Sequence, residues 1–124
     1  MSRTLFTLFL VSSLSGCCMG GTSSSSSPAA TTTGTTGACD VSVNVSSCRD
    51  LSGGAFVLGE QFQRDLCMGT YTSGGACPAP GRVGSCDDGA GTITRYYSTG
   101  ALPYTADTAR SECTAMAGNT FTPG

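Results

Sequence analysis

The pattern of apolar and polar positions divides the chain into three parts. Residues 5–11 are apolar except for Thr7, residues 19–38 are almost entirely Gly, Ser, Thr and Ala, and apolar positions return in short periodic stretches from residue 39 onward. The first run is far shorter than the roughly 20 apolar residues that cross a bilayer as a helix. The second part has almost nothing to bury, so we expect a flexible linker with an r.m.s. span of about 25 Å.

The clearest secondary-structure pattern lies near the C-terminus. Residues 92–98 are rich in β-branched and aromatic side chains, which predicts a strand. Thr105 is a suitable N-cap for a following helix that ends before Gly118, and residues 120–122 form a short closing strand. The apolar positions that recur at helical spacing in that helix are Ala106, Ala109, Cys113, Met116 and Ala117.

Two further strands are expected upstream. Valine alternates with Ser and Asn over residues 41–45, which is typical of a half-buried strand. Residues 82–86 form another, and the turn residues Asp87-Asp88-Gly89 favour a hairpin between it and residues 92–98.

An internal repeat is visible between residues 48–67 and 94–113. At an offset of 46 residues they align without gaps, and after each terminal cysteine comes a glycine and then Thr-aromatic-Thr. We interpret this as a degenerate duplication of a strand–helix–strand unit. The first helix should be shorter or more frayed, because Gln63 and Gly59 replace Ala109 and Thr105. The six identical positions are Arg49/Arg95, Ser52/Ser98, Gly54/Gly100, Ala55/Ala101, Arg64/Arg110 and Cys67/Cys113.

Cysteine content changes the picture of how this domain is stabilised. Charged residues make up 11% of a chain with 18 glycines, so the apolar core is expected to be weak. Neither a zinc site nor a thioredoxin-type redox site is favoured, because the chain lacks histidine and the domain has no C-x-x-C pair. We therefore predict three disulfides, no metal and no cofactor, with all 15 pairings left open. The cysteines concerned are Cys39, Cys48, Cys67, Cys77, Cys86 and Cys113.

These patterns together predict the fold class. We expect an α+β domain with a small antiparallel sheet, one or two short helices, disulfide staples and a degenerate internal duplication. Residues 39–124 form this cysteine-rich domain.

The residues Leu14-Ser15-Gly16-Cys17 follow the apolar run directly. They resemble the lipobox of bacterial lipoproteins. The resemblance implies a signal peptide over residues 1–16, a diacylglyceryl group on the Cys17 thiol, and a lipid anchor and linker over residues 17–38. It places the protein in the cell envelope, and Cys18 in place of an aspartate favours the outer membrane. A plain secretory signal followed by a disulfide cysteine is the alternative.

The second half of the chain carries a further resemblance. Ala76-Cys77-Pro78, the segment GRVGSC at residues 81–86, Thr94-Arg95-Tyr96-Tyr97 and the helix that ends at Cys113 are its main features. Over residues 67–124 the chain resembles small cysteine-rich lipoproteins of myxobacterial type. The resemblance implies an envelope lipoprotein and transfers no activity or site residues.

Function is expected to be structural or interactive, without catalysis. With no histidine or lysine, the chain cannot form a Ser-His or Cys-His arrangement or a Schiff base. From Cys17 onward it has five arginines and eight acidic residues, a net charge of −3, which does not favour nucleic acid. The expected partners are the membrane, through the lipid on Cys17, and an unidentified protein or glycan.

Two other function classes have candidate residues. A glycan hydrolase would use the pair Asp87 and Asp88, or Glu60 with Asp65, although adjacent aspartates before a glycine more often form turns. A ligand-binding module would use a surface of aromatic side chains beside an arginine, although a strand usually buries one of two adjacent tyrosines. The residues of that candidate face are Tyr96, Tyr97, Tyr104 and Arg95.

Overall fold

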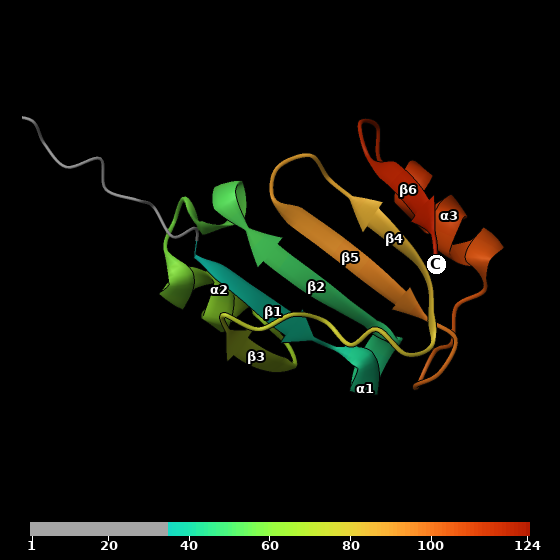
Figure 1. Cartoon of the computed structure of the whole chain (residues 1–124), viewed down its shortest axis with the longest axis horizontal. Helices are drawn as coiled ribbons and strands as arrows, with labels where there is room; N and C mark the ends of the chain where they lie inside the picture. The colour runs from blue at the N-terminus through green and yellow to red at the C-terminus, as the bar shows by residue number, and fades with distance from the viewer. Residues whose placement is uncertain (1–34) are drawn as a thin grey trace, which may run out of the picture. The chain divides into compact units, whose positions relative to one another are not determined.

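The computed structural model describes residues 35–124, so the lipobox and the two adjacent cysteines lie outside the described residues. The described part is a six-stranded antiparallel sheet with the strand order β3-β1-β2-β5-β4-β6 (Figure 1). Short helices and three disulfides complete it, which confirms the expected small α+β domain. The elements are β1 Thr36–Asp40, α1 Ser42–Val45, β2 Ser47–Ser52, the 3-10 helix η1 Gly53–Phe56, α2 Glu60–Leu66, β3 Thr70–Ser73, β4 Arg82–Asp87, β5 Thr92–Tyr97, α3 Ala106–Thr114 and β6 Thr120–Pro123.

The C-terminal elements match their predictions. β4 and β5 form the expected hairpin, and β6 is the closing strand. At the start of α3, Thr105 and Thr108 each accept a hydrogen bond from the other's backbone N–H, a reciprocal cap. The helix ends at Thr114, so Met116 lies beyond it and is exposed, contrary to its expected place on the apolar face.

The first helix is the weaker of the two, as predicted. α2 has seven residues against nine in α3, and none of them is buried. Its N-cap, Gly59, has no side chain that could accept a hydrogen bond from the first turn. α3 by contrast buries Ala109 and Cys113 against β4.

The strand predicted over residues 41–45 is wrong. These residues form the single helical turn α1, and Val43 is exposed. The Asp40 carboxylate accepts the backbone N–H of Ser42 at 2.9 Å, which turns the chain out of β1. Ser46, at φ 51°, then returns the chain into β2, so a local side-chain hydrogen bond overrides the alternation of valines.

The domain begins before Cys39, inside the segment expected to be linker. β1 starts at Thr36, and Ala38 is buried between β2 and β3. Gly37 lies under the ring of Tyr71, and a Cβ at that position would collide with the phenol. The small residues that resembled linker composition are therefore required here by packing.

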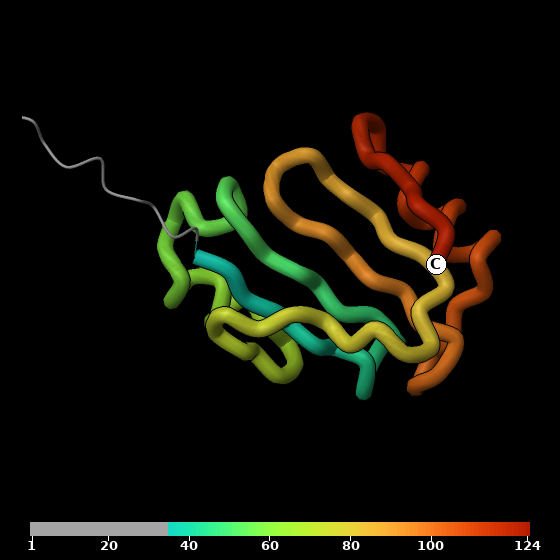
Figure 2. The backbone as a smooth tube through the Cα atoms, viewed as in Figure 1, coloured from blue at the N-terminus to red at the C-terminus, as the bar shows by residue number. Residues whose placement is uncertain are grey.

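The sheet consists of two copies of one unit. β1, β2, α2 and β3 follow each other in the first copy as β4, β5, α3 and β6 do in the second (Figures 1 and 2). In each unit the first strand lies between the other two, and the second strands, β2 and β5, pair at the centre of the sheet. The topology thus repeats as the sequence duplication predicts.

Matching contacts recur in the two units. Cys39–Cys67 joins β1 to the end of α2, and Cys86–Cys113 joins β4 to α3. Arg64 of α2 lies over the ring of Tyr71 and Arg110 of α3 over that of Phe121, each 5.1 Å from the ring centroid. Both helices are therefore held to the same face of the sheet in the same way.

The gap-free alignment is off by one residue in the central strands. Cys39 pairs with Arg49 and its counterpart Cys86 pairs with Thr94, so Arg49 corresponds to Thr94 and not to Arg95. Arg49 and Thr94 also face each other across the β2–β5 pair, and the pseudo-two-fold axis passes between them. A shift of one residue moves a side chain to the other face, so the identical arginines Arg49 and Arg95 lie on opposite faces.

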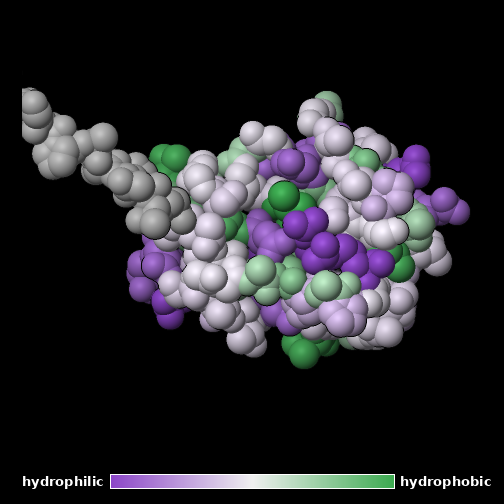
Figure 3. All heavy atoms as spheres, in the orientation of Figure 1, coloured by the Kyte–Doolittle hydropathy of each residue, from purple (hydrophilic) through white to green (hydrophobic). Residues whose placement is uncertain are grey.

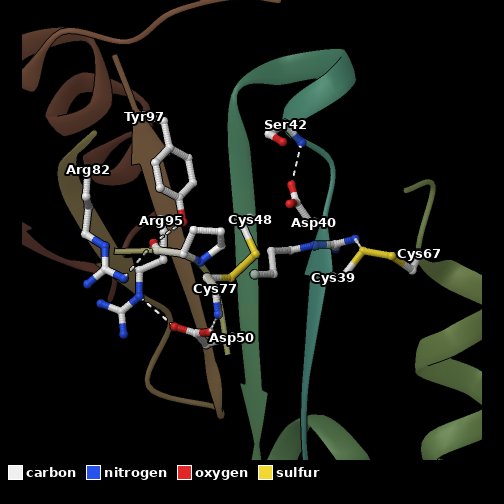
Figure 4. The surroundings of a disulfide bond; sticks show 12 residues. Cys39, Asp40, Ser42, Cys48, Asp50, Cys67, Cys77, Arg82, Arg95 and Tyr97 are labelled. Carbon is white, nitrogen blue, oxygen red and sulfur yellow. Dashed lines mark hydrogen bonds and ion pairs between the residues drawn. A yellow bond between two sulfur atoms is a disulfide. The ribbon is translucent and has the colours of Figure 1, made fainter. Parts of the chain in front are cut away.

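The face away from the helices is covered by the segment between β3 and β4, which crosses β1 and β2 (yellow in Figure 2). The disulfide Cys48–Cys77 fastens this segment to β2. The Asp50 carboxylate accepts the N–H of Cys77 at 2.6 Å and the Nε–H of Arg95 at 2.7 Å (Figure 4). Hydrophilic residues gather near the middle of this face (purple in Figure 3). Both faces of the central strands are thus in contact with other parts of the chain.

Candidate functional site

The helical face of the sheet carries a groove of about 460 Å³. Its floor consists of side chains from the two central strands: Ser47 and Arg49 from β2, and Thr92, Thr94 and Tyr96 from β5. Val41, Asn44, Val45 and Met68 line one side, and Cys86, Asp88, Glu112, Cys113, Met116 and Asn119 line the other. A volume of this size is within the range of pockets that bind small molecules.

Arg49 lies at the centre of the floor. It is half-buried, and its Nη2–H donates to the Cys39 sulfur at 3.6 Å. Among residues 35–124 no carboxylate lies within ion-pair distance of this guanidinium. The two ion pairs in that part of the chain are formed by Arg64 and Arg95. Sulfur is a weak acceptor, so most of the five N–H donors of Arg49 have no partner within the described domain.

The row that contains Arg49 crosses the whole sheet. Direct cross-strand pairs place one side chain of each strand in it, all on the helical face. The two cysteines in the row are the ones bonded to α2 and α3, so the disulfides fix the row relative to both helices. From edge to edge the row is Tyr71, Cys39, Arg49, Thr94, Cys86 and Phe121.

Two acidic residues also line the groove, and both accept hydrogen bonds within the domain. Asp88 accepts the backbone N–H groups of Ala90 and Thr92 at 2.7 and 3.0 Å. Partial burial by itself raises the pKa of Asp88, but the N–H groups of Thr92 and Ala90 outweigh it and hold that pKa below its usual value. Asp88 therefore acts as a charged turn former near neutral pH.

The second acid, Glu112 of α3, accepts the hydroxyl of Tyr104 at 2.8 Å. Burial, followed by this hydrogen bond, raises the pKa of Tyr104 to about 12. The tyrosine therefore remains a donor to Glu112 across the physiological pH range.

The four residues of the expected ligand face do not form one exposed surface. Tyr96 and Tyr97 are neighbours on β5, so they point to opposite faces, and they are 4% and 5% exposed. Tyr104 packs against Tyr96 with ring centroids 4.7 Å apart. Arg95 points to the same face as Tyr97, away from the groove, and pairs with Asp50. The expectation of a common face is wrong because the C-terminal end of β5 is covered on both faces: Tyr96 packs against Tyr104, and the Tyr97 hydroxyl donates to the carbonyl of Pro78 at 2.8 Å.

The carboxylate pairs considered for hydrolysis are engaged elsewhere. Asp87 accepts the N–H of Gly89 at 2.8 Å, so it forms the hairpin turn together with Asp88. On α2, Glu60 pairs with Arg64 and Asp65 accepts from Gln61, each one helical turn apart. All four carboxylates therefore have local structural partners.

All six domain cysteines are paired, as the sequence predicts. The connectivity is Cys39–Cys67, Cys48–Cys77 and Cys86–Cys113. Cys17, the expected lipidation site, lies outside the described residues.

Within residues 35–124, no cluster of histidine, cysteine and acidic residues could hold a metal, and no helix is long and apolar enough to cross a membrane. No protein-family model, curated protein or solved structure matches the chain.

Proposed function

We propose that the protein is a non-catalytic interaction module held at the cell envelope by a lipid on Cys17. The groove on the helical face carries this proposal, because it is a preformed concave surface whose floor and walls are joined by disulfides. A rigid site loses little conformational entropy when a partner binds.

Anchoring is proposed from the sequence. Leu14-Ser15-Gly16-Cys17 matches the lipobox at every position, and β1 begins 19 residues after Cys17. A Gly-, Ser- and Thr-rich segment of that length suits a tether between an outer-membrane anchor and the groove.

A protein partner is favoured over the alternative, a free glycan. Sugar binding commonly uses exposed aromatic faces, and the one aromatic residue that lines the groove, Tyr96, is 4% exposed. Catalysis has no support from the groove, whose two acidic residues serve a turn and a tyrosine.

Replacing Cys17 with alanine should move the protein from the membrane fraction to the soluble fraction of producing cells. A lipid on this thiol would supply the membrane affinity, and the variant cannot carry it. Fractionation followed by immunoblotting measures the change, and Cys18→Ala is the matched control that should stay with the membrane. Membrane association of Cys17→Ala equal to that of the unaltered protein would contradict the anchor.

A photo-crosslinker in the groove should capture an envelope component in intact cells. Met116 lines the groove and Leu102 lies outside it, and they are similarly exposed, at 69% and 62%. A benzoylphenylalanine at position 116 should form a discrete adduct on irradiation, at least several times stronger than at position 102. Equal labelling at both positions, or none at position 116, would count against the groove as the contact surface.

A further inference from the structure

We infer that the groove binds the C-terminal end of a peptide, with the terminal carboxylate on Arg49. The inference rests on the proposed function and names the ligand class of the same groove.

Recognition in this groove must come from side chains. β2 and β5 are internal strands with a neighbour on each side, so their backbone groups are already used in the sheet. A bound peptide therefore cannot add as another strand on the floor. Among the residues that line the groove, Arg49 is the only cation.

The guanidinium of Arg49 has the donors that a carboxylate requires. Its one hydrogen bond in the described domain goes to a disulfide sulfur, and it points to the face on which the groove lies. Arginine binds a carboxylate through two parallel charge-assisted hydrogen bonds, which are stronger than neutral ones. The opposing Thr94 offers a hydroxyl as an additional donor.

The break in the internal symmetry supports a single anion site. Arg49 and Thr94 occupy corresponding positions of the two units and face each other on the pseudo-two-fold axis. Directly opposed side chains in an antiparallel pair are about 5 Å apart at Cβ, so two arginines here would repel each other. An arginine opposite a short hydroxyl leaves one positive charge with room beside it.

The sides of the groove favour a peptide over other carboxylates. Val41, Val45, Met68 and Met116 supply apolar surface, and the two methionines are 83% and 69% exposed, so they are free to adapt to an apolar side chain. Hydroxyl and amide side chains lie among them and suit peptide groups better than a hydrocarbon tail. These polar residues are Asn44, Ser47, Thr92, Thr94 and Asn119.

The acidic residues restrict where the carboxylate binds. Asp88 and Glu112 line the groove beside β4 and α3, and both repel an anion. A terminal carboxylate is therefore directed to Arg49 at the centre, and the preceding peptide N–H groups are left to face the acids.

The test compares two peptide pools that differ in one group. The full chain, purified in detergent, is equilibrated with N-acetylated tetrapeptides randomised over Ala, Leu, Val, Ser and Tyr, in free-acid or C-terminally amidated form. Retained peptide is measured by equilibrium dialysis and mass spectrometry. We expect the free-acid pool to bind about tenfold more tightly or better, which is the range for hydrogen bonds to charged groups.

Variants localise the effect. Arg49→Gln should abolish the preference for the acid, whereas Arg110→Gln removes the same charge outside the groove and should keep it. Equal binding of the two pools by the unaltered protein, or no binding of either at about 1 mM peptide, overturns the inference without reference to any variant. An unchanged preference in Arg49→Gln overturns it too. If position 116 forms the crosslinked adduct but the free-acid pool is not preferred, only the binding of a peptide C-terminus is refuted. If neither the adduct nor the preference is observed, the proposed interaction role of the groove is refuted as well.

Discussion

Reduction of the three disulfides should unfold the domain at 25 °C. The bonds close loops with sequence separations of 28, 29 and 27 residues, and loops of this size restrict the unfolded chain by about 3–4 kcal/mol each. Together they contribute about 10 kcal/mol, which is comparable to the 5–15 kcal/mol net stability of a typical domain.

The core offers little to compensate for that loss. The largest fully buried side chains are those of three cysteines and a serine, Cys39, Cys48, Cys113 and Ser46. Leu51 is the one buried leucine among residues 35–124, and large aliphatic side chains such as Val57 and Leu58 are exposed. A domain built in this way resembles the small exported scaffolds that depend on crosslinks.

The measurement is a thermal scan of the full chain by near-ultraviolet circular dichroism, before and after reduction and alkylation. The oxidised protein should show a cooperative transition, and the reduced protein none. Peptide mapping without reduction serves as the control and should return the three pairs of the structure. A cooperative transition that survives complete alkylation would show that packing alone stabilises the sheet.

Local sequence patterns are sufficient to identify the helices and strands of the second unit, but not those of the first. α3 has a capping threonine and helical spacing, and the β4–β5 hairpin has its aspartate turn, so both could be identified from neighbouring residues. β1 could not, because its small residues are set by tertiary packing: Gly37 lies under the ring of Tyr71, and Ala38 is buried on the opposite face against the Cys48–Cys77 disulfide and Tyr97. The composition of a linker and that of a tightly packed strand are the same in this case.

The disulfide pairing could not be predicted from the repeat, because the aligned segments are shorter than the structural units. The aligned segments begin at Cys48 and Thr94, so they omit the first strand of each unit and with it the correspondence of Cys39 with Cys86. Once that correspondence is known, the like pairs Cys39–Cys67 and Cys86–Cys113 follow from the duplication, and Cys48–Cys77 remains.

The groove depends on strand register, which the sequence does not specify here. Arg49 and Arg95 are an identical pair in the gap-free alignment, yet the two arginines lie on opposite faces and have different roles. An offset of one residue decides which arginine lines the groove and which pairs with Asp50. The burial of both Tyr96 and Tyr97 is also a tertiary effect, since other parts of the chain cover both faces of the sheet at the end of β5.

Gly91 should be the glycine least tolerant of alanine in the β4–β5 turn, and Gly89 provides the matched comparison. Both have positive φ, at +111° and +70°, so a side chain is strained at either position, at a cost of about 1–2 kcal/mol. A Cβ on Gly89 meets nothing within 4 Å, whereas one on Gly91 would collide with the backbone carbonyl of Ser52. That carbonyl belongs to the last residue of β2, and the carbonyl of Gly91 accepts the Ser52 N–H at 2.8 Å, so the clash cannot be relieved without separating the two units at this end.

Overpacking against a fixed backbone costs about 1–3 kcal/mol beyond the conformational strain. We therefore expect Gly91→Ala to lower the free energy of unfolding by about 3 kcal/mol or more, and Gly89→Ala by about 1 kcal/mol. Urea titration of the oxidised variants, followed by circular dichroism, measures both values. Equal destabilisation would mean that the contact between the turn and Ser52 does not constrain the fold, and that the two units are held together at the β2–β5 pair alone.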